Sequence, residues 1–317
     1  MKNRSCKSLT TIRLATSVSS NLTAAQMNTG KTKYVIVTPV RDEEAYLRLT
    51  VESVITQTIR PAEYVIVNDG SKDRTGDIID EYAQQYPWIR AVHRQDRGFR
   101  KWGAGIIEAF YDGFHALARQ DWEFMCKLDG DLSFEPEYFE GTFEKFEQSP
   151  RLGIGGGFLY HLEDGQKILE RHPTFHVRGG AKIYRRACWD AIDGLWVGPG
   201  SDTVDEVKAN MLGWSTSSFL DLQIHHHRWT GAAYGRWGGI VKNGKTDYVS
   251  GYHPLFVLAK SVARSVQRPY VLGSFALIYG YLAAYLEKIP QVNDAELIQY
   301  LRRQQLAKLV GKETIWK

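Results

Sequence analysis

The 317-residue chain contains only three cysteines, Cys6, Cys126 and Cys188, and their positions follow no motif spacing. An odd number without such spacing argues against a disulfide framework and favours a reducing compartment, so we expect a cytoplasmic protein. The formal net charge is only +4, and no long run of lysine and arginine stands out. Charge alone therefore gives no argument for a nucleic-acid partner, although it suits an anionic substrate or an anionic membrane surface.

The first thirty residues contain no aspartate or glutamate and no apolar run long enough for a secretory signal. They are rich in serine, threonine and asparagine. We expect residues 1–32 to form a disordered N-terminal extension. A transit peptide is the alternative that this composition loosely resembles.

From Lys33 onward, strand-like and helix-like apolar patterns alternate along the chain. Three helical patterns separate the strand-like ones, and in the third we expect Ile106, Phe110, Phe114 and Leu117 to point inward. The alternation predicts an α/β fold, with a Rossmann-type, mostly parallel sheet and helices on both faces. The strand-like segments are KYVIVTPV (33–40), AEYVIVNDGS (62–71), WIRAVHR (88–94) and WEFMCKLDGD (122–131).

Each predicted strand is followed by a loop of polar or charged residues, and in a parallel sheet such loops meet at one edge, where ligands bind. The fourth loop carries Asp129 and Asp131, separated by Gly130, which lets the chain turn tightly. Two neighbouring carboxylates repel each other unless a cation lies between them, and oxygen ligands suit Mg²⁺ or Mn²⁺. A solvated turn is the simpler interpretation of such a motif alone, but its place among the other loops favours a metal site.

After about Pro150 the alternation becomes irregular, which predicts an α+β extension of the same domain. We expect a nucleotide-binding part at 33–135, an acceptor part at 136–245, and a helical region at 246–317. Residues 269–286 carry no charge and just reach the lower limit of a membrane span. We favour a helix lying in the membrane interface at the inner face of the membrane, with a buried helix and a true span as alternatives.

The ordered segments VIVTPVRDEE, VIVNDGSKDRT, GAGIIEAFYDG and CKLDGDLSF resemble the family 2 glycosyltransferases of the GT-A fold. The resemblance covers roughly Lys33 to Gly231. It implies a nucleotide-sugar donor, with UDP favoured over GDP, a D-x-D site for Mn²⁺ or Mg²⁺, and inverting transfer. The residues that it places at the donor and its metal are Pro39, Val40 and Glu43 beside the nucleoside, Asp69 on the base, Arg97, Arg100 or Lys101 near the diphosphate, and Asp129 and Asp131 as the D-x-D pair.

The resemblance also implies a catalytic base in an acidic pair before a helix that ends in glycine and an aromatic residue. Counting back from Gly213 gives Asp202, although Ser201 stands where the pair has its first acid. Asp205, with Glu206 beside it, is the competing choice. The base would take the proton of the acceptor hydroxyl as that hydroxyl attacks the sugar.

Three adjacent histidines follow in the segment HHHRWTG (225–231). Some GT-A enzymes add a histidine to the metal shell here, and we name His227 first and His225 second. Strand alternation would direct these two to one face and His226 to the other. The Q-x-x-R-W motif of processive synthases is absent, since His225 stands where it has glutamine, so we expect single transfers.

The sequence therefore predicts a metal-dependent hexosyltransferase that uses a glycan or lipid-linked acceptor in cell-surface polysaccharide or glycolipid synthesis. Two alternatives remain open at this point. A sugar nucleotidyltransferase would need a glycine-rich loop after the first strand, and this chain has none there. A non-catalytic glycan-binding protein could share the fold, because a fold does not fix an activity.

Overall fold

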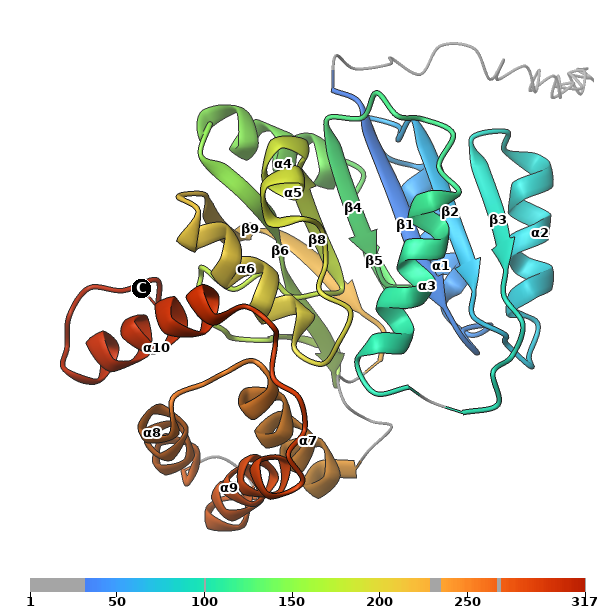
Figure 1. Ribbon diagram of the computed structural model, residues 1–317. Coiled ribbons are helices and arrows are strands. Elements are labelled where there is room, and N and C mark those ends of the chain that lie inside the picture. Colours follow the sequence, from blue (N-terminus) through green and yellow to red (C-terminus); the bar gives the residue numbers. More distant parts are fainter. Residues whose placement is uncertain (1–31, 100, 229–234, 267–268, 317) are drawn as a thin grey trace, which may run out of the picture.

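The computed structural model describes residues 32–99, 101–228, 235–266 and 269–316. The predicted N-terminal extension, except its last residue, and the predicted diphosphate-binding Arg100 lie outside these ranges. A central sheet flanked by helices fills the larger part of the molecule, and the C-terminal helices form a separate group beside it (Figure 1).

The described strands form one sheet in the order β3-β2-β1-β4-β8-β6-β9-β5, with β7 paired to β6. Strands β1 to β4 are mutually parallel, whereas β8, β5 and β7 join through antiparallel pairs. The α/β class predicted from the sequence is therefore confirmed. The strands are β1 (Tyr34–Val40), β2 (Glu63–Asn68), β3 (Ile89–His93), β4 (Phe124–Leu128), β5 (Leu132–Phe134), β6 (Leu152–Glu163), β7 (Gln166–Leu169), β8 (Ala181–Arg185) and β9 (Ser215–His226).

Both faces of the parallel strands are covered, because successive side chains of a strand point to opposite faces. In β1, Tyr34 and Ile36 pack into one core cluster and Val35 and Val37 into another. The first cluster contains residues of α1, α2 and α4, and the second contains residues of α3, α5 and α6. These helices are α1 (Leu47–Ile55), α2 (Thr75–Gln85), α3 (Ala104–His115), α4 (Tyr138–Gln148), α5 (Arg186–Ile192) and α6 (Ser201–Met211).

The inward face of α3 differs from the expected one at a single position. Ile106 is 43% exposed, and its neighbour Ile107 is buried instead. Gly113 sets this phase, because its Cα lies so close to Val37 and Val67 that any side chain there would collide with both. Small residues decide which face of this helix meets the sheet, and the pattern of large apolar residues did not show that.

Strand β1 has β2 on one side and β4 on the other, and both pairs are parallel. The order in which strands are added to the sheet therefore reverses at β1. Open α/β sheets bind ligands at the carboxyl ends of the strands beside such a reversal. Here those ends are Val40, Asn68 and Leu128. The fold therefore places the predicted polar loops around one position.

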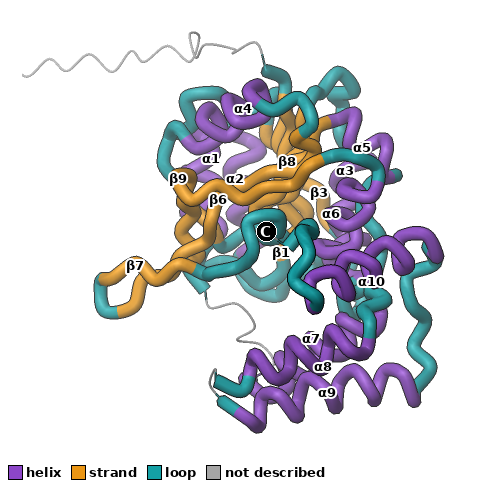
Figure 2. The backbone as a smooth tube through the Cα atoms, turned by 90° about the vertical axis from the view of Figure 1, so that its left-hand side faces the viewer, coloured by secondary structure: helices purple, strands orange, loops and turns teal. Residues whose placement is uncertain are grey.

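The C-terminal helices are α7 (Gly235–Val249), α8 (Pro254–Arg264), α9 (Val271–Leu286) and α10 (Ala295–Leu309), and the first three lie together below the sheet (Figure 2). α7 and α9 cross closely, because Gly244 and Gly280 each lie against a carbonyl of the other helix. The predicted boundary at residue 245 falls inside α7. Among the described helices, none combines the length and the apolar character that crossing a membrane requires, and α9 has 16 residues.

Candidate active site

The predicted loops surround a cavity of about 370 Å³ at the carboxyl ends of β1, β2 and β4. Every described residue that was predicted to bind the donor lines this cavity, so the structure brings these side chains together. The lining residues are Pro39, Val40, Arg41, Glu43, Asp69, Arg97, Phe99, Lys101, Gly103, Gly105, Ile106, Ala109, Asp129, Gly130, Asp131, Arg228 and Lys242.

Asp69 lies at the end of β2 and is held by arginines from the loop after β3. Arg94 Nη1 lies 2.5 Å from Asp69 Oδ1, and the Arg97 guanidinium contacts Oδ2. Arg41 Nη1 donates to the Asp69 carbonyl at 3.2 Å. Both carboxylate oxygens thus have cationic partners, so this side chain is fixed in position at the wall of the cavity.

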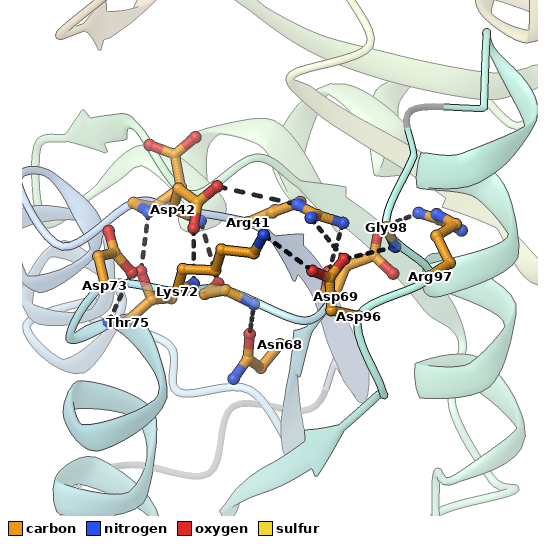
Figure 3. Close-up of polar contacts among 12 residues, drawn as sticks. Arg41, Asp42, Asn68, Asp69, Lys72, Asp73, Thr75, Asp96, Arg97 and Gly98 are labelled. Carbon is orange, nitrogen blue, oxygen red and sulfur yellow. Dashed lines mark hydrogen bonds and ion pairs between the residues drawn. The ribbon is translucent and has the colours of Figure 1, made fainter.

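Main-chain and side-chain hydrogen bonds join the loops after β1 and β2 (Figure 3). Lys72 N donates to Asp42 Oδ1 at 2.8 Å, and Thr75 Oγ1 accepts from Glu43 N at 2.8 Å. Asp96 accepts from Arg41 Nη2 at 2.6 Å and so ties the loop after β3 to the same group. Hydrogen bonds therefore connect the loops after β1, β2 and β3 into one group beside the cavity.

Asp129 follows directly on β4 and is paired with a buried lysine of that strand. Lys127 Nζ donates to Asp129 Oδ1 at 2.8 Å and to the Gly179 carbonyl at 2.7 Å. Burial raises the pKa of the Asp129 carboxyl, and the charge of Lys127 only partly opposes this effect. The Asp129 N–H donates to the Gly180 carbonyl at 2.7 Å, which fixes the start of the turn against the segment before β8.

Asp131 meets two cationic side chains across the cavity. Arg228 donates to Asp131 Oδ2 from Nε and Nη2, both at 3.1 Å, and His226 Nε2 lies 3.5 Å from the same oxygen. Burial would raise the pKa of Asp131, but His226 and Arg228 outweigh burial and keep this pKa below its ordinary value. Gly130 is required between the two aspartates, because a side chain there would overlap Val40.

Glu43 completes a group of three carboxylates at this end of the cavity. Its Oε1 accepts from Arg228, and its buried Oε2 has no hydrogen-bond partner among the described residues. Burial raises the pKa of Glu43 to about 7, because the Arg228 guanidinium opposes burial only in part and the charges of Asp131 and Asp129 add to it. This carboxyl therefore remains poorly compensated within the protein.

Asp202 lies in the first turn of α6, on the far side of Gly179 and Gly180. A side chain at Gly179 would overlap the Asp202 carboxylate, and one at Gly180 would come within 3.5 Å of Asp129 Oδ2. This two-glycine segment is therefore the backbone that lies between both carboxylates. Burial opposes ionisation of Asp202, but the nearby charges of Lys182 and Lys127 lower its pKa, so it is an anion at neutral pH.

Asp205, the competing candidate for the base, is in the core instead. It accepts from Lys182 Nζ at 3.0 and 3.1 Å and from the Tyr184 hydroxyl at 2.5 Å. Burial raises the pKa of Asp205 to about 6, although Lys182 opposes the effect. Glu206 accepts from the same lysine at 2.8 Å and from Val177 N at 2.7 Å. These contacts join α6 to β8 and to the segment before it.

The three histidines alternate along the end of β9 as expected. The rings of His225 and His227 lie 4.1 Å apart on one face. His227 Nε2 lies 2.8 Å from Ser133 Oγ, and His225 stacks on Tyr160. The ring beside Asp131 is that of His226, which was not among the predicted ligands. Burial would lower the pKa of His226, but the interactions with Asp131 and Glu170 outweigh burial and raise this pKa to about 9.

A sequence model of glycosyl transferase family 2 matches residues 35–195, slightly more than half of the chain. The chain belongs to glycosyl transferase family 2. The family indicated by the sequence is thereby confirmed, and the match covers β1 to α5, including the cavity loops and the two-glycine segment.

Curated family relatives match about half of the chain. Putative glycosyltransferase EpsH of Bacillus subtilis is 34% identical over 175 residues, which are 49% of this chain and 48% of EpsH. Glycosyltransferase GlyA of Streptococcus pneumoniae is 27% identical over 156 residues, 48% of this chain and 20% of GlyA. Minor teichoic acid biosynthesis protein GgaA of B. subtilis is 24% identical over 172 residues, 48% of this chain and 37% of GgaA. The chain thus spans half or less of the length of these relatives.

Solved structures with the same fold include GalNAc-T7 with UDP, GalNAc and Mn²⁺, at a TM-score of 0.57 and 12% identity. That match covers 90% of this chain and 55% of GalNAc-T7. The mannosyltransferase PcManGT of Pyrobaculum calidifontis, in complex with GDP-mannose and Mn²⁺, has a TM-score of 0.52 and 13% identity, with 89% and 76% of the two chains covered. At these identities the likeness establishes the GT-A-like fold of this family 2 chain.

Several residues of this family 2 site were not predicted from the sequence. Lys127 stands within the buried strand two positions before Asp129, and a charge inside an apolar run could have identified it. Lys182 interrupts the strand AKIYR in the same way. Arg228 and His226 gave no comparable signal, because their partners Glu43 and Asp131 are distant in sequence.

We expect Lys182→Met to destabilise the protein strongly. It would leave Asp205 buried without its cation, and Glu206 with only the His176 ring, 2.9 Å away, as a side-chain partner, at a cost of about 3–5 kcal/mol at pH 7. The folded-state pKa values of the two carboxyls would then rise above those of the unfolded chain. The variant should therefore recover stability as the pH falls from 7 towards 4, because the folded state takes up protons. Urea unfolding at several pH values measures both effects.

Lys145→Met is the matched control, since Lys145 pairs at 2.6 Å with Asp221, whose side chain is 61% exposed. Removing such a surface pair should cost about 1 kcal/mol or less. If Lys182→Met were equally mild, or if its cost did not shrink at low pH, the buried network would not support the fold as described.

Proposed function

We propose that this chain is an inverting, divalent-metal-dependent glycosyltransferase that moves a sugar from a nucleoside diphosphate-sugar to an acceptor hydroxyl. One observation carries the proposal. Asp69, Asp129 and Asp131 line a single cavity at the reversal of the sheet, and Asp202 lies just beyond the two-glycine segment. Such an arrangement separates donor-binding carboxylates from one candidate base.

The nucleoside would bind along Pro39 and Val40, with Asp69 reaching the base. The diphosphate would lie towards the N-terminus of α3, where the helix dipole and main-chain N–H groups favour an anion. Arg97 and Lys101 border that end of the cavity. UDP is the donor nucleotide that we propose. GDP is the alternative, because GalNAc-T7 was solved with UDP and PcManGT with GDP-mannose.

The donor set around Asp131 suits a divalent cation. Glu43, Asp129 and Asp131 supply hard carboxylate oxygens, and Glu43 Oε2 is buried without a hydrogen-bond partner among the described residues. Mn²⁺ or Mg²⁺ would be held by the two aspartates, with diphosphate oxygens completing the shell. Bound there, the cation would stabilise negative charge on the leaving diphosphate.

Asp202 would accept the proton of the acceptor hydroxyl. As that proton leaves, the acceptor oxygen forms a bond to the anomeric carbon, and the bond from this carbon to the diphosphate oxygen breaks on the opposite face. The lowered pKa of Asp202 keeps the carboxylate in the form that can accept a proton at neutral pH. Asp205 is the second candidate, but its oxygens are engaged by Lys182 and Tyr184 in the core.

The acceptor would approach across Gly179 and Gly180, where the absence of side chains lets a sugar lie close to the backbone. The acceptor that we propose is a glycan or lipid-linked intermediate of a cell-surface polysaccharide or glycolipid. The relative GgaA, a minor teichoic acid biosynthesis protein, supports this class of product.

Binding of nucleotide and cation can be tested together by thermal unfolding with UDP or GDP, each with and without Mn²⁺. A ligand at 100 times its Kd adds about 2.7 kcal/mol to stability. We expect UDP with Mn²⁺ to stabilise the wild type most, and Asp131→Asn to lose the Mn²⁺-dependent part. Asp221→Asn, a change at an exposed ion pair, should keep it. Stabilisation by UDP that persists unchanged in excess chelator would exclude the cation from the donor site.

The base assignment predicts different results for two neighbouring aspartates. Asp202→Asn should lower the turnover of a sugar donor by at least about 100-fold and leave the Kd for UDP near the wild-type value. Asp205→Asn should mainly reduce the free energy of unfolding, because it alters the buried Lys182 network. Transfer rates, UDP titrations and urea unfolding of both variants separate these outcomes. The assignment is wrong if Asp205→Asn, folded as well as the wild type, is the variant that stops transfer.

We also propose that α8 and α9 hold the enzyme at the cytoplasmic face of a membrane. Ser261 and Ser274 exchange hydrogen bonds of 2.9 and 2.7 Å that hold the two helices side by side (Figure 2). Their exposed apolar residues recur at helical spacing, which gives each helix one outward apolar face. These residues are Leu255, Leu258, Val262 and Val266 on or just after α8, and Leu272, Phe275, Tyr279, Leu282 and Leu286 on α9.

The charges of this region suit an anionic lipid surface. Residues 235–288 contain seven lysines and arginines and only two acids, Asp247 and Glu287. Both acids are already paired, with Lys260 at 2.9 Å and with Lys245 at 2.7 Å. A large apolar face with a basic surround is typical of proteins that lie on a membrane.

The double variant Phe275→Glu/Leu282→Glu should reduce binding to vesicles containing phosphatidylglycerol by at least about tenfold in a flotation assay, because two charges would enter the apolar face. Leu162→Glu is the control, since Leu162 is exposed to a similar degree on β6. Equal binding of all three proteins, or no binding by the wild type, would contradict the proposed membrane contact.

A further inference from the structure

His161, Glu170 and His226 form a compact cluster near the donor site but outside the cavity lining. His161 belongs to β6, Glu170 follows β7 directly, and His226 is the last residue of β9. His161 is 2% exposed, and the side chains of Glu170 and His226 are 12% and 13% exposed. The cluster is therefore enclosed, and it joins three neighbouring strands, since β7 and β9 both pair with β6 (Figure 2).

Main-chain hydrogen bonds fix the positions of all three residues. Tyr160 and His225 are partners in the β6–β9 pair, so His161 and His226 follow in neighbouring positions. The N–H of Glu170 donates to the Leu159 carbonyl at 2.9 Å, which returns this residue to β6. His161 and His226 are therefore part of the sheet, and the main chain ties Glu170 to β6 directly after β7.

One atom of each side chain points to a common centre. Glu170 Oε1 lies 2.5 Å from His161 Nε2 and 3.2 Å from His226 Nδ1. All three atoms lie within 4.8 Å of one another. Ligand atoms of a tetrahedral zinc ion are separated by about 3.3 Å, given bond lengths near 2.0–2.1 Å. Shifts of about an ångström would therefore convert the cluster into a coordination shell.

The outward atoms of the same side chains have partners of the kind that orient metal ligands. His161 Nδ1 lies 3.0 Å from the His226 carbonyl, and because a carbonyl can only accept, Nδ1 carries the proton. His226 Nε2 is directed at Asp131 Oδ2, 3.5 Å away. Glu170 Oε2 contacts the guanidinium of Arg178. Histidines that bind a metal usually donate their second N–H to a carbonyl or carboxylate. His161 does so here, and the second nitrogen of His226 faces a carboxylate.

This pattern leaves a charge problem at the centre. In a neutral His161 the proton on Nδ1 leaves a lone pair on Nε2, and this lone pair faces the carboxylate of Glu170. Two electron-rich atoms so close together require either an additional proton or a cation between them. Two imidazole nitrogens and one carboxylate oxygen form a donor set that zinc prefers and that Mg²⁺ does not.

We propose that His161, Glu170 and His226 bind a zinc ion that is separate from the donor-site cation. The ion would tie the β6–β7 hairpin to the end of β9. It would also hold His226 with its Nε2–H towards Asp131, so this histidine would position the aspartate and would not itself bind the donor cation. The site does not rest on the proposed transfer reaction, since it needs neither nucleotide nor acceptor.

The test uses the full chain, purified without a histidine tag and stripped of metal. Zn²⁺ is titrated against a chelating dye, and Co²⁺ is added in parallel to report tetrahedral nitrogen and oxygen ligands by visible absorption. We expect one equivalent of either ion to bind without nucleotide, with Zn²⁺ preferred. Glu170→Gln and His161→Asn should each weaken Zn²⁺ binding by at least about 100-fold, whereas Glu163→Gln on the same hairpin should not change it.

Asp131→Asn distinguishes this site from the donor site. It should lose Mn²⁺-dependent UDP binding and keep the Zn²⁺ equivalent, while Glu170→Gln should keep most of the UDP and Mn²⁺ response. Circular dichroism tests whether each variant folds. If His161→Asn does not fold, the result for Glu170→Gln decides between the outcomes. Absence of stoichiometric Zn²⁺ or Co²⁺ in the wild type would overturn the proposal and leave a protonated cluster. Loss of the ion in Asp131→Asn alone would equally overturn it.

Discussion

The candidate active site depends on two buried lysines that face each other across neighbouring strands. Lys127 of β4 and Lys182 of β8 are partners in the antiparallel pair, and both are almost completely buried. Buried charges of one sign are tolerated only when opposite charges surround them. Lys127 bonds Asp129, and Lys182 bonds Asp205 and the main-chain carbonyl of Asp202. One register between two strands therefore fixes Asp129, the candidate base Asp202 and the start of α6 relative to one another.

This charge arrangement also separates two roles that neighbouring carboxylates could have shared. Asp205 gives its oxygens to Lys182 and Tyr184, which makes it part of the core. Asp202 receives the favourable field of both lysines, but Lys182 bonds its main-chain carbonyl and not its carboxylate. Gly179 then allows the backbone to lie directly against that carboxylate. A buried cation thus keeps the Asp202 side chain ionised without occupying it, which is what a proton acceptor at neutral pH requires.

The sequence predicted those parts of the site that depend on local pattern. Strands β1, β2 and β4 and their polar ends followed from apolar runs. The described residues predicted for the nucleotide, the diphosphate and the D-x-D pair line one cavity, whereas His225 and His227 do not. What the sequence could not show depends on register and on contacts between distant segments. Alternation correctly separated His226 from its two neighbours, but it could not tell which face meets Asp131. The register of β5 with β9, which pairs Leu132 with His226, decides that, and β5 has only three residues.

Arg228 determines how the proposed donor and its cation would enter. Its guanidinium lies between Glu43 and Asp131, where it already compensates the two carboxylates that a divalent ion would approach. A bare cation would have to displace it and leave a guanidinium near a doubly charged ion, which is electrostatically costly. A cation that arrives with a nucleoside diphosphate brings phosphate oxygens, and these can accept the displaced guanidinium. The same carboxylates that would attract the ion would therefore admit it together with its nucleotide, which couples cation binding to donor binding in the proposed reaction.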